Sequence, residues 1–370
     1  MQFGVSSKIK QIARMDLPGG GQVVVENGYC YVGHMDPPHG TSIIDVKDPK
    51  HPKLVTEIEI PVGLHSHKVR VNDDVMLVNY ERYQTKEKLD AGLKIFDVSD
   101  KSRPREIAFF KGERGVHRFT FDGRYAYLSI DIEGYLGNIV MIVDLKDPSR
   151  PQEVGRWWMP GQWTAGGEKP TWKERDHRCH HPLRKGNRLY AGYWQGGFVI
   201  LDISDMSKPK LISHFDWSPP YPSPTHTTLP LPWKLRDRDF LVVTDEEASK
   251  LAPTPPAFLW MVDITEETRP IPVSTYMVPG DGTDGLGGRF GAHQPAEQLY
   301  DNTMYVTWFA GGLRAVDISN PYQPREVGYY VPLPGKGQKI AMSNDVFRRD
   351  DGLLFLVDRY DGLEILESEL

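Results

Sequence analysis

The sequence predicts an all-β protein folded as a seven-bladed β-propeller, with four strands in each blade and one domain spanning residues 1–370. Three observations lead to this prediction. A short motif recurs along nearly the whole chain, pairs of alternating hydrophobic runs precede its copies, and the segments at the two ends resemble two parts of one repeat. Repeats of about 50 residues are typical of propellers and solenoids.

The recurring motif is a hydrophobic strand that reaches an acidic residue and then a turn containing proline. Residues 92–98 (GLKIFDV), followed by Pro104, form a clear copy. A truncated copy ends the chain. The acidic markers of the seven copies are Asp45, Asp97, Asp144, Asp202, Asp263, Asp317 and Glu367. Their regular spacing indicates that one structural unit is repeated from end to end.

Each repeat contains signals for four short strands. In residues 117–128, two alternating runs flank Asp122-Gly123, a pair typical of a hairpin turn. The motif strand comes third, and a run such as residues 151–156 comes fourth. Because the repeats contain no amphipathic helical window, this content is that of a propeller blade.

The two ends of the chain are predicted to complete one blade together. Residues 8–17 resemble a fourth strand without the three strands that should precede it, and the C-terminus stops after a third strand. Pairing the N-terminal run with the last repeat would close the ring and leave no unpaired sheet edge at the junction.

Composition narrows the range of functions. The net charge is -6 and no basic stripe is present, so nucleic acid is not an expected partner. No apolar window approaches the length of a membrane span, and the N-terminus has no apolar signal segment. Two cysteines form no disulfide framework, which favours a reducing compartment and a cytoplasmic protein. The oligomeric state is not predicted.

Histidines recur at one position of the repeat. When the repeats are aligned by their hairpin turns, five of seven carry a histidine at the start of the first strand, where chance would give about 3% per position. These residues are His67, His117, His181, His226 and His293, with Asn344 in the last repeat. First strands line the central channel of a propeller, so the imidazoles are predicted to converge and bind a divalent metal ion, namely zinc, iron or manganese.

Other polar and aromatic residues are predicted to surround that ion. Acids at the ends of second strands are candidate catalytic groups: Glu81, Asp131, Asp245 and Glu246. Candidate substrate-binding residues are Arg114, Arg178, Arg289, Trp194, Trp308 and Asn344. Further histidines that are expected near the same face are His34, His39, His65, His177 and His180. In the alternative interpretation, the charged residues are solvated at the rim and the tryptophans only pack against loops.

The motif copies at residues 142–144 (IVD) and 43–45 (IID) resemble the LVIVD-repeat β-propeller family, and the resemblance covers nearly the whole chain. It implies the propeller fold and says little about chemistry, because one fold hosts many functions. Axial histidines in a propeller are similar in geometry to those of the carotenoid-cleaving oxygenases, which hold iron, and of oligogalacturonate lyase, which holds manganese.

Three functions remain open. The favoured one is a metal-dependent enzyme that catalyses hydrolysis of, or an elimination reaction on, a small carboxylated or lactone-like substrate. It is favoured because many acids and arginines are predicted at the rim of the site. A non-haem iron oxygenase acting on an aromatic or alkene substrate is the second. The third is a protein-binding propeller whose histidines are structural. No serine-nucleophile elbow, phosphate loop, dinucleotide-binding motif or zincin motif is present.

Overall fold

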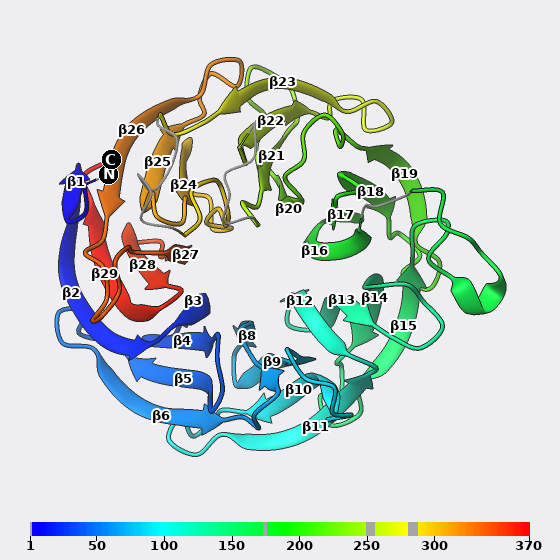
Figure 1. Ribbon diagram of the computed structural model, residues 1–370, viewed down its shortest axis with the longest axis horizontal. Coiled ribbons are helices and arrows are strands. Elements are labelled where there is room, and N and C mark those ends of the chain that lie inside the picture. The colour runs from blue at the N-terminus through cyan, green and yellow to red at the C-terminus, as the bar shows by residue number, and fades with distance from the viewer. Residues whose placement is uncertain (1, 173–175, 249–255, 280–287) are drawn as a thin grey trace.

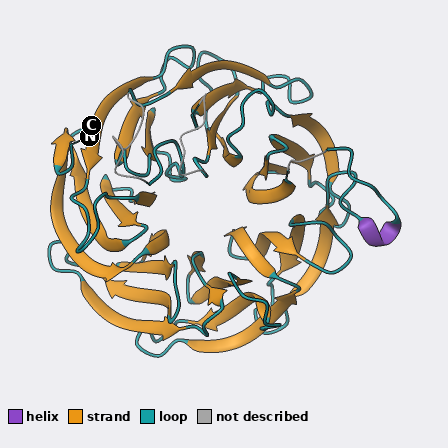
Figure 2. Cartoon of the chain, in the orientation of Figure 1, coloured by secondary structure: helices purple, strands orange, loops and turns teal. Residues whose placement is uncertain are grey.

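A computed structural model describes residues 2–172, 176–248, 256–279 and 288–370 of the protein. In this part of the chain the strands are arranged in a ring around a central axis and follow one another in sequence order (Figure 1). The helical structure there is one 3-10 turn, η1 (Thr164–Gly166), which lies at the outer edge (Figure 2). No helix in these ranges is long and apolar enough to cross a membrane.

The strands form five antiparallel sheets, of which three have four strands each. One contains β3 (Gly20–Glu26), β4 (Tyr29–His34), β5 (His39–Asp45) and β6 (Lys53–Glu59) in that order. A second has the order β1 (Val5–Ser7), β26 (Arg325–Val331), β25 (Leu313–Asp317) and β24 (Thr303–Thr307). A third has the order β2 (Ile9–Pro18), β29 (Asp361–Ser368), β28 (Leu353–Asp358) and β27 (Ser343–Arg348).

The two larger sheets have nine and eight strands. The first contains β7 (Leu64–His65), β8 (Val69–Asn72), β9 (Val75–Arg82), β10 (Ala91–Asp97), β11 (Arg105–Gly112), β12 (Gly115–Phe121), β13 (Tyr125–Asp131), β14 (Ile139–Asp144) and β15 (Gln152–Trp157). The second contains β16 (His177–Lys185), β17 (Arg188–Trp194), β18 (Phe198–Asp202), β19 (Lys210–Phe215), β20 (Thr225–Pro230), β21 (Phe240–Asp245), β22 (Leu259–Asp263) and β23 (Ile271–Tyr276). Each of these sheets divides into two groups of strands that are linked by a single residue pair. The pair is Gly115 with Glu81 in the nine-stranded sheet and Trp194 with Thr225 in the eight-stranded sheet.

The two ends of the chain meet in one sheet. Strand β2 pairs with β29 from Ile9 opposite Ser368 to Pro18 opposite Asp361, so the run at residues 8–17 lies where the sequence places it. The short β1 pairs with β26 in the neighbouring sheet, which the sequence did not indicate. The N-terminal segment therefore binds two adjacent sheets across the junction of the ring.

Hydrophobic residues are packed between neighbouring sheets. One cluster joins Tyr31 and Ile43 of the first sheet to Val78 and Phe96 of the next. Inner strands such as β13 are buried along most of their length, whereas outer strands such as β6 are half exposed. Burial on both faces explains why the inner strands read as nearly continuous hydrophobic runs.

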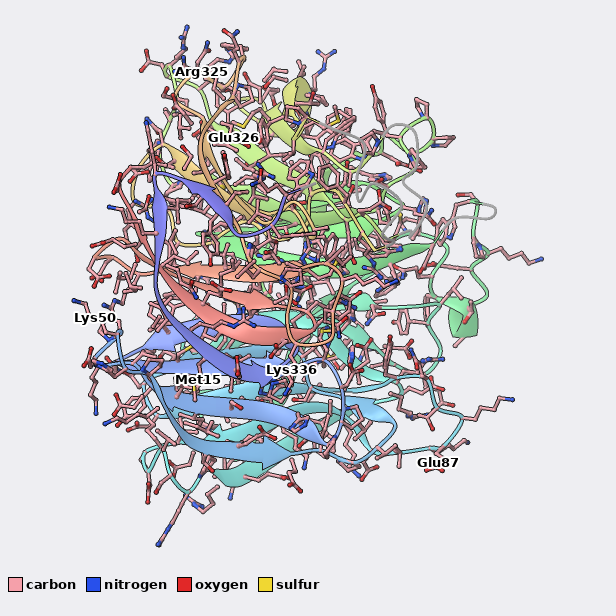
Figure 3. The ribbon with its side chains drawn as sticks, turned by 60° about the vertical axis from the view of Figure 1, so that its left-hand side comes forward. Met15, Lys50, Glu87, Arg325, Glu326 and Lys336 are labelled. Atoms are coloured by element: carbon pink, nitrogen blue, oxygen red, sulfur yellow. The ribbon has the colours of Figure 1, made fainter. Side chains whose placement is uncertain are left out.

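The disc has two different faces. Second strands end and first strands begin at one face, and the turns between third and fourth strands lie at the other. Lys50, in the β5–β6 turn, projects from one side of the molecule, whereas Glu87, in the β9–β10 connection, projects from the opposite side (Figure 3). Glu81, at the end of β9, therefore lies near the face that carries Glu87.

The first strands of two repeats are irregular. The repeat containing His67 divides its first strand between β7 and β8, with His67 in the break. Around His293 the described residues form only isolated bridges, such as Pro295 with Val306. Pro295 has no backbone N–H to donate, which weakens a regular ladder there.

Candidate metal centre

A cavity of about 530 Å³ lies on the axis where the first strands begin and the second strands end. Six histidines line it: His65, His67, His117, His180, His226 and His293. Charged side chains from the rim and the floor complete the lining, among them Glu81, Glu246, Arg118 and Arg359. Four of the five rings that the repeat pattern predicts to converge therefore line one cavity, namely those of His67, His117, His226 and His293.

Local β-bulges in the first strands explain why the rings converge. In β12, Val116 faces Ile130 and the next paired residue is Arg118 opposite Ser129, so His117 is left without a partner. The same shift skips His226 in β20 and Asn344 in β27. A bulge bends its strand and re-aims the side chain of the extra residue. The recurrent histidine position is therefore the bulged position of the first strand.

In β16 the structure places His180, not His181, at this position. Pairing stops after His177 opposite Trp194 and resumes at His181 opposite Gly192, so three residues face one. His181 instead occupies the place of Arg118 and lies outside the cavity, with its Nδ1 3.2 Å from Thr227 Oγ1 and its Nε2 3.3 Å from Glu297. Counting residues back from the hairpin turn does not reveal this extra length, so the alignment is one residue off here.

The six rings form a continuous arc. Neighbouring ring centroids are 3.8 Å apart for His65 and His67, 5.2 Å for His67 and His117, 4.9 Å for His117 and His180, 4.5 Å for His180 and His226, and 4.3 Å for His226 and His293. Two groups within this arc have ligand atoms close enough to share an ion. They are His65, His67, Glu81 and His117, and His180, His226 and Glu246.

Hydrogen-bond partners fix the tautomers of three of these rings. His180 Nδ1 lies 3.0 Å from the carbonyl oxygen of His226, and His293 Nδ1 lies 2.6 Å from that of Asn344. His117 Nδ1 lies 2.9 Å from a carboxylate oxygen of Glu81. Carbonyl and carboxylate oxygens only accept hydrogen bonds, so each Nδ1 carries the proton and each Nε2 presents a lone pair. Metal-binding histidines are usually oriented by such acceptors.

Two of these lone pairs face each other. His117 Nε2 and His180 Nε2 are 3.1 Å apart. Burial lowers the pKa of both rings, in His117 against the raising effect of Glu81, so neither imidazolium is favoured. Two nitrogens that each lie about 2.0–2.1 Å from one ion would be separated by roughly this distance. The two nitrogens are therefore spaced so that both could bind one cation.

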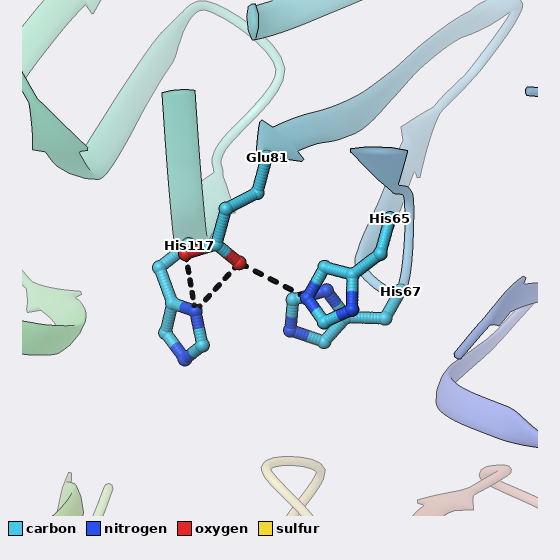
Figure 4. Close-up of side chains that lie close together, drawn as sticks. All are labelled: His65, His67, Glu81 and His117. Atoms are coloured by element: carbon cyan, nitrogen blue, oxygen red, sulfur yellow. Dashed lines mark hydrogen bonds and ion pairs between the residues drawn. The ribbon is translucent and has the colours of Figure 1, made fainter. Parts of the chain in front are cut away.

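Glu81 supports the arc from the end of β9. Its carboxylate accepts hydrogen bonds from His117 Nδ1 and from His65 Nε2, the latter at 3.0 Å (Figure 4). Burial alone would raise the pKa of Glu81, but the electrostatic interactions and hydrogen bonds with His117 and His65 outweigh it and hold the pKa well below its usual range. The opposite ring nitrogen of His65, Nδ1, is buried without a hydrogen-bond partner. It is thus available as a ligand.

His67 and His226 are held differently. Asn79 Oδ1 accepts the backbone N–H of Lys68, so the amide nitrogen of Asn79 faces His67 Nδ1, 3.2 Å away, and donates to it. The proton of neutral His67 is then on Nε2. His226 Nδ1 lies 2.7 Å from Thr227 Oγ1, and its Nε2 accepts from the Arg118 guanidinium at 2.8 Å. Both rings would need rearrangement before Nε2 could bind an ion.

The structure brings most of the other predicted site residues to the cavity. Eight of these residues line it, namely Glu81, Asp131, Glu246, Arg114, Arg178, Arg289, Trp194 and Asn344. Asp245 and Trp308 do not. Asp245 accepts a hydrogen bond from Trp260 Nε1 at 2.7 Å within a hydrophobic layer, and Trp308 is fully buried in another hydrophobic cluster. Successive strand residues point to opposite faces, so Asp245 turns inward where Glu246 turns toward the cavity.

The further histidines that the sequence predicts near this face fall into two groups. His65 and His180 join the cavity, whereas His177 is stacked on Trp172 with ring centroids 4.5 Å apart. His34 lies inside its own sheet, with its ring nitrogens bonded to Pro18 and Ser42, and His39 is paired with Glu57.

Three cationic residues of the cavity are not among the predicted site residues: Lys68, Arg118 and Arg359. Lys68 and Arg118 directly follow His67 and His117. The repeat alignment that located the histidines would therefore also have brought these two residues to the axis.

Comparisons with known proteins support the fold. LVIVD repeats match residues 20–59, 89–111, 121–158, 185–216 and 298–331. The WD40 repeats of RRP9 are similar over 99% of each chain, with a TM-score of 0.64 and 11% identity. The C-terminal WD40 domain of Sif2 is similar over 98% of this chain and 99% of its own, with a TM-score of 0.59 and 9% identity.

Saccharomyces cerevisiae Sqt1 is similar over 95% of this chain and 83% of its own, with a TM-score of 0.58 and 8% identity. No curated protein sequence matches the chain. Identities this low carry information about architecture and none about chemistry. The chain is therefore an LVIVD-repeat protein with a β-propeller fold.

Proposed function

We propose that this protein is a metal-dependent enzyme. At its axial histidine site it would catalyse either the hydrolysis of a small carboxylated or lactone-like compound or an elimination reaction on such a compound. The observation that carries the proposal is the approach of His117 Nε2 and His180 Nε2 to 3.1 Å, with each Nδ1 proton held by an acceptor. Two lone pairs at this distance repel each other unless a positive charge lies between them.

A divalent ion supplies that charge more readily than a proton. A shared proton would make one buried imidazolium, and burial disfavours the charged ring. Imidazole nitrogens with a nearby carboxylate suit zinc, iron and manganese. His117 and His180 would be the central ligands, and His293, which lies beyond His226 in the arc and has the same tautomer, is a further candidate.

The ion would polarise a carbonyl group of the substrate. The chain's own groups would then position and move protons. Glu81 keeps His117 oriented and is committed to that task by its hydrogen bonds. Asp131 does not orient His117. Burial together with the charge of Glu113 raises the pKa of Asp131 to about 6, so it can gain or lose a proton near neutral pH. Glu246 lies on the opposite side, bound to Arg289.

Two other functions are supported by particular features. Trp194, whose ring centroid is 4.8 Å from that of His180, gives the site an aromatic wall that would suit an iron oxygenase acting on an aromatic or alkene substrate. His34 and His181 are buried and bonded within the protein, as every histidine would be in a non-catalytic, protein-binding propeller. The propeller fold is compatible with both functions.

We also propose that the ring has seven blades. The two larger sheets each consist of two groups joined by one residue pair, and the three four-stranded sheets supply the other blades. The last blade takes its outer strand from β2. Seven copies of the sequence motif agree with this count.

Metal content tests the proposal directly. Purified protein reconstituted with zinc, iron or manganese should retain about one ion per chain after gel filtration, because several converging imidazoles hold a divalent ion strongly. His117→Ala and His180→Ala should each lose most of it. His214→Ala is the matched control, since His214 lies on the outer strand β19 and should leave the metal content unchanged.

The outcomes separate the three functions. Less than about 0.1 ion per chain after reconstitution would remove the metal site and favour the protein-binding propeller. A retained ion with turnover of simple lactones or esters would support hydrolysis, and oxygen uptake by the iron form would support the oxygenase. A retained ion with neither activity would leave a metal-binding protein without the proposed reaction.

A further inference from the structure

Cations outnumber acids on the side of the cavity away from Glu81. Arg289 and Arg359 lie at this rim, and Lys68 and Arg118 are buried below them. Glu246 is the carboxylate that lines this side, and it is bound to Arg289 at 2.9 Å. Lys68 donates only to the carbonyl oxygen of Gly21 among the contacts within the described residues.

The two remaining arginines have neutral partners. Arg359 donates to the side-chain oxygen of Asn344 at 3.2 Å, and no carboxylate of the described residues lies within ion-pair distance of it. Arg118 donates to His226 Nε2 at 2.8 Å and to Gln294 Oε1 at 2.7 Å, while its Nε is buried without a partner. Burial lowers the pKa of both guanidinium groups, and the charge of Arg289 adds to this effect at Arg359. The charges of Asp345, Glu297 and Glu246 oppose this lowering at Arg118, and that of Glu246 opposes it at Arg359, but within the described residues no carboxylate is hydrogen-bonded to either guanidinium group.

Arg114 and Arg178, which the sequence singled out as carboxylate ligands, are less suited to that role. Arg114 is exposed, and Arg178 is paired with Asp176 at 2.8 Å and lies over the ring of Trp194. Asn344, by contrast, is buried and firmly placed, because its amide donates to the carbonyl oxygen of Gly21 at 2.9 Å. It fixes Arg359 where the guanidinium faces the cavity.

We propose that the cavity holds an oxyanion, a carboxylate or a phosphate group, between Arg359 and Arg289, with Asn344 positioning Arg359. The inference rests on the proposed function, because an anion held here would place the rest of the ligand beside His117 and His180. The planar guanidinium fork matches the paired oxygens of either anion. The negative charge of the ligand would also offset the positive charge of Arg289, Arg359, Lys68 and Arg118, which Glu246 and the buried Asp345 balance only in part.

Metal-free protein, prepared with a chelator, allows this site to be tested without contribution from the ion. Malonate and inorganic phosphate are titrated separately by calorimetry at low ionic strength, so that the two arms distinguish carboxylate from phosphate. Arg359→Met should weaken binding at least about tenfold, which is the loss expected for a hydrogen bond to a charged group. Arg289→Met should weaken it as well, and Arg359→Lys should fall between wild type and Arg359→Met.

Arg349→Met is the matched control, because Arg349 is paired with Asp351 outside the cavity, and it should bind like wild type. Circular dichroism and melting temperature establish that each variant folds. Equal affinity of Arg359→Met and wild type, or no binding of either anion to wild type, would overturn the inference. Anion binding without metal uptake would overturn only the proposed metal function, and metal uptake without anion binding only the oxyanion site.

Discussion

At the scale of single residues, the cavity shows how neighbours decide the chemistry of one side-chain type. His117, His180 and His293 each donate from Nδ1 to an oxygen, whereas His67 accepts at Nδ1 from Asn79. Rings that belong to one repeated position therefore present different atoms to the cavity. Only the first three are ready to bind an ion through Nε2.

Asp131 gives a residue-scale prediction for pH dependence. Burial, with Glu113, raises its pKa from 3.8 to about 6, so the folded state holds this proton more tightly than the unfolded state. Its contribution to stability is full below pH 4 and is lost as the pH rises through 6. Asp131→Asn should match wild type below pH 4 and exceed it by about 1–2 kcal/mol at pH 7, allowing for partial exposure.

Urea unfolding between pH 3.5 and 8 measures this difference in the free energy of unfolding. If the difference between Asp131→Asn and wild type stays constant from pH 3.5 to 8, the ionisation of Asp131 is not its cause.

At the scale of elements, two devices shape the molecule. Bulges in the first strands turn one residue of each toward the axis, and β2 supplies the outer strand of the sheet that contains the C-terminus. Both devices are local departures from a simple repeated ladder. The bulges build the site, and β2 links the two ends of the ring.

Ile9 gives a prediction about that link. It begins β2, is only 1% exposed, and packs in the cluster that includes Leu313, Leu354 and Leu366. Ile9→Ala should lower the free energy of unfolding by about 2–5 kcal/mol, because it leaves a cavity in this cluster. Lys10→Ala, one residue further along and exposed, should change it by less than about 0.5 kcal/mol. Urea denaturation of the two variants makes the comparison, and similar losses in both would contradict this role for Ile9.

At the scale of the whole molecule, the site depends on closure of the ring. His67 and His293 lie in distant parts of the sequence, yet both reach the same cavity. Glu369 N–H donates to the carbonyl oxygen of Lys8, so the two ends of the chain lie together, as Figure 1 shows. The position of the chain ends should therefore matter less than the completeness of the ring.

A circular permutant tests this. The native ends are joined by a short flexible linker, and the chain is opened between Ser149 and Arg150, in the exposed turn between β14 and β15. The permutant then begins with an outer strand and ends with a third strand, as the natural chain does. It should keep the metal content of wild type and melt within about 5 °C of it, because the same sheets and cavity form. A folded permutant that has lost the metal would show that the native junction itself shapes the site.

The amino-acid sequence by itself determined the repeat, the strand content, the pairing of residues 8–17 with the last repeat, and the gathering of histidines on the axis. These features follow from local patterns that every repeat shares, so neighbouring copies reinforce one another. Hydrophobic alternation and turn residues are visible without knowledge of distant contacts.

Tertiary structure alone decided which atoms meet. The extended bulge in β16 brings His180 to the axis in place of His181, and strand alternation sends Glu246 into the cavity while Asp245 turns into the core. The tautomers, the 3.1 Å approach of His117 and His180, and the neutral partners of Arg118 and Arg359 arise between repeats. A shift of one residue reverses the direction of a side chain, and pattern spacing cannot resolve a shift that small.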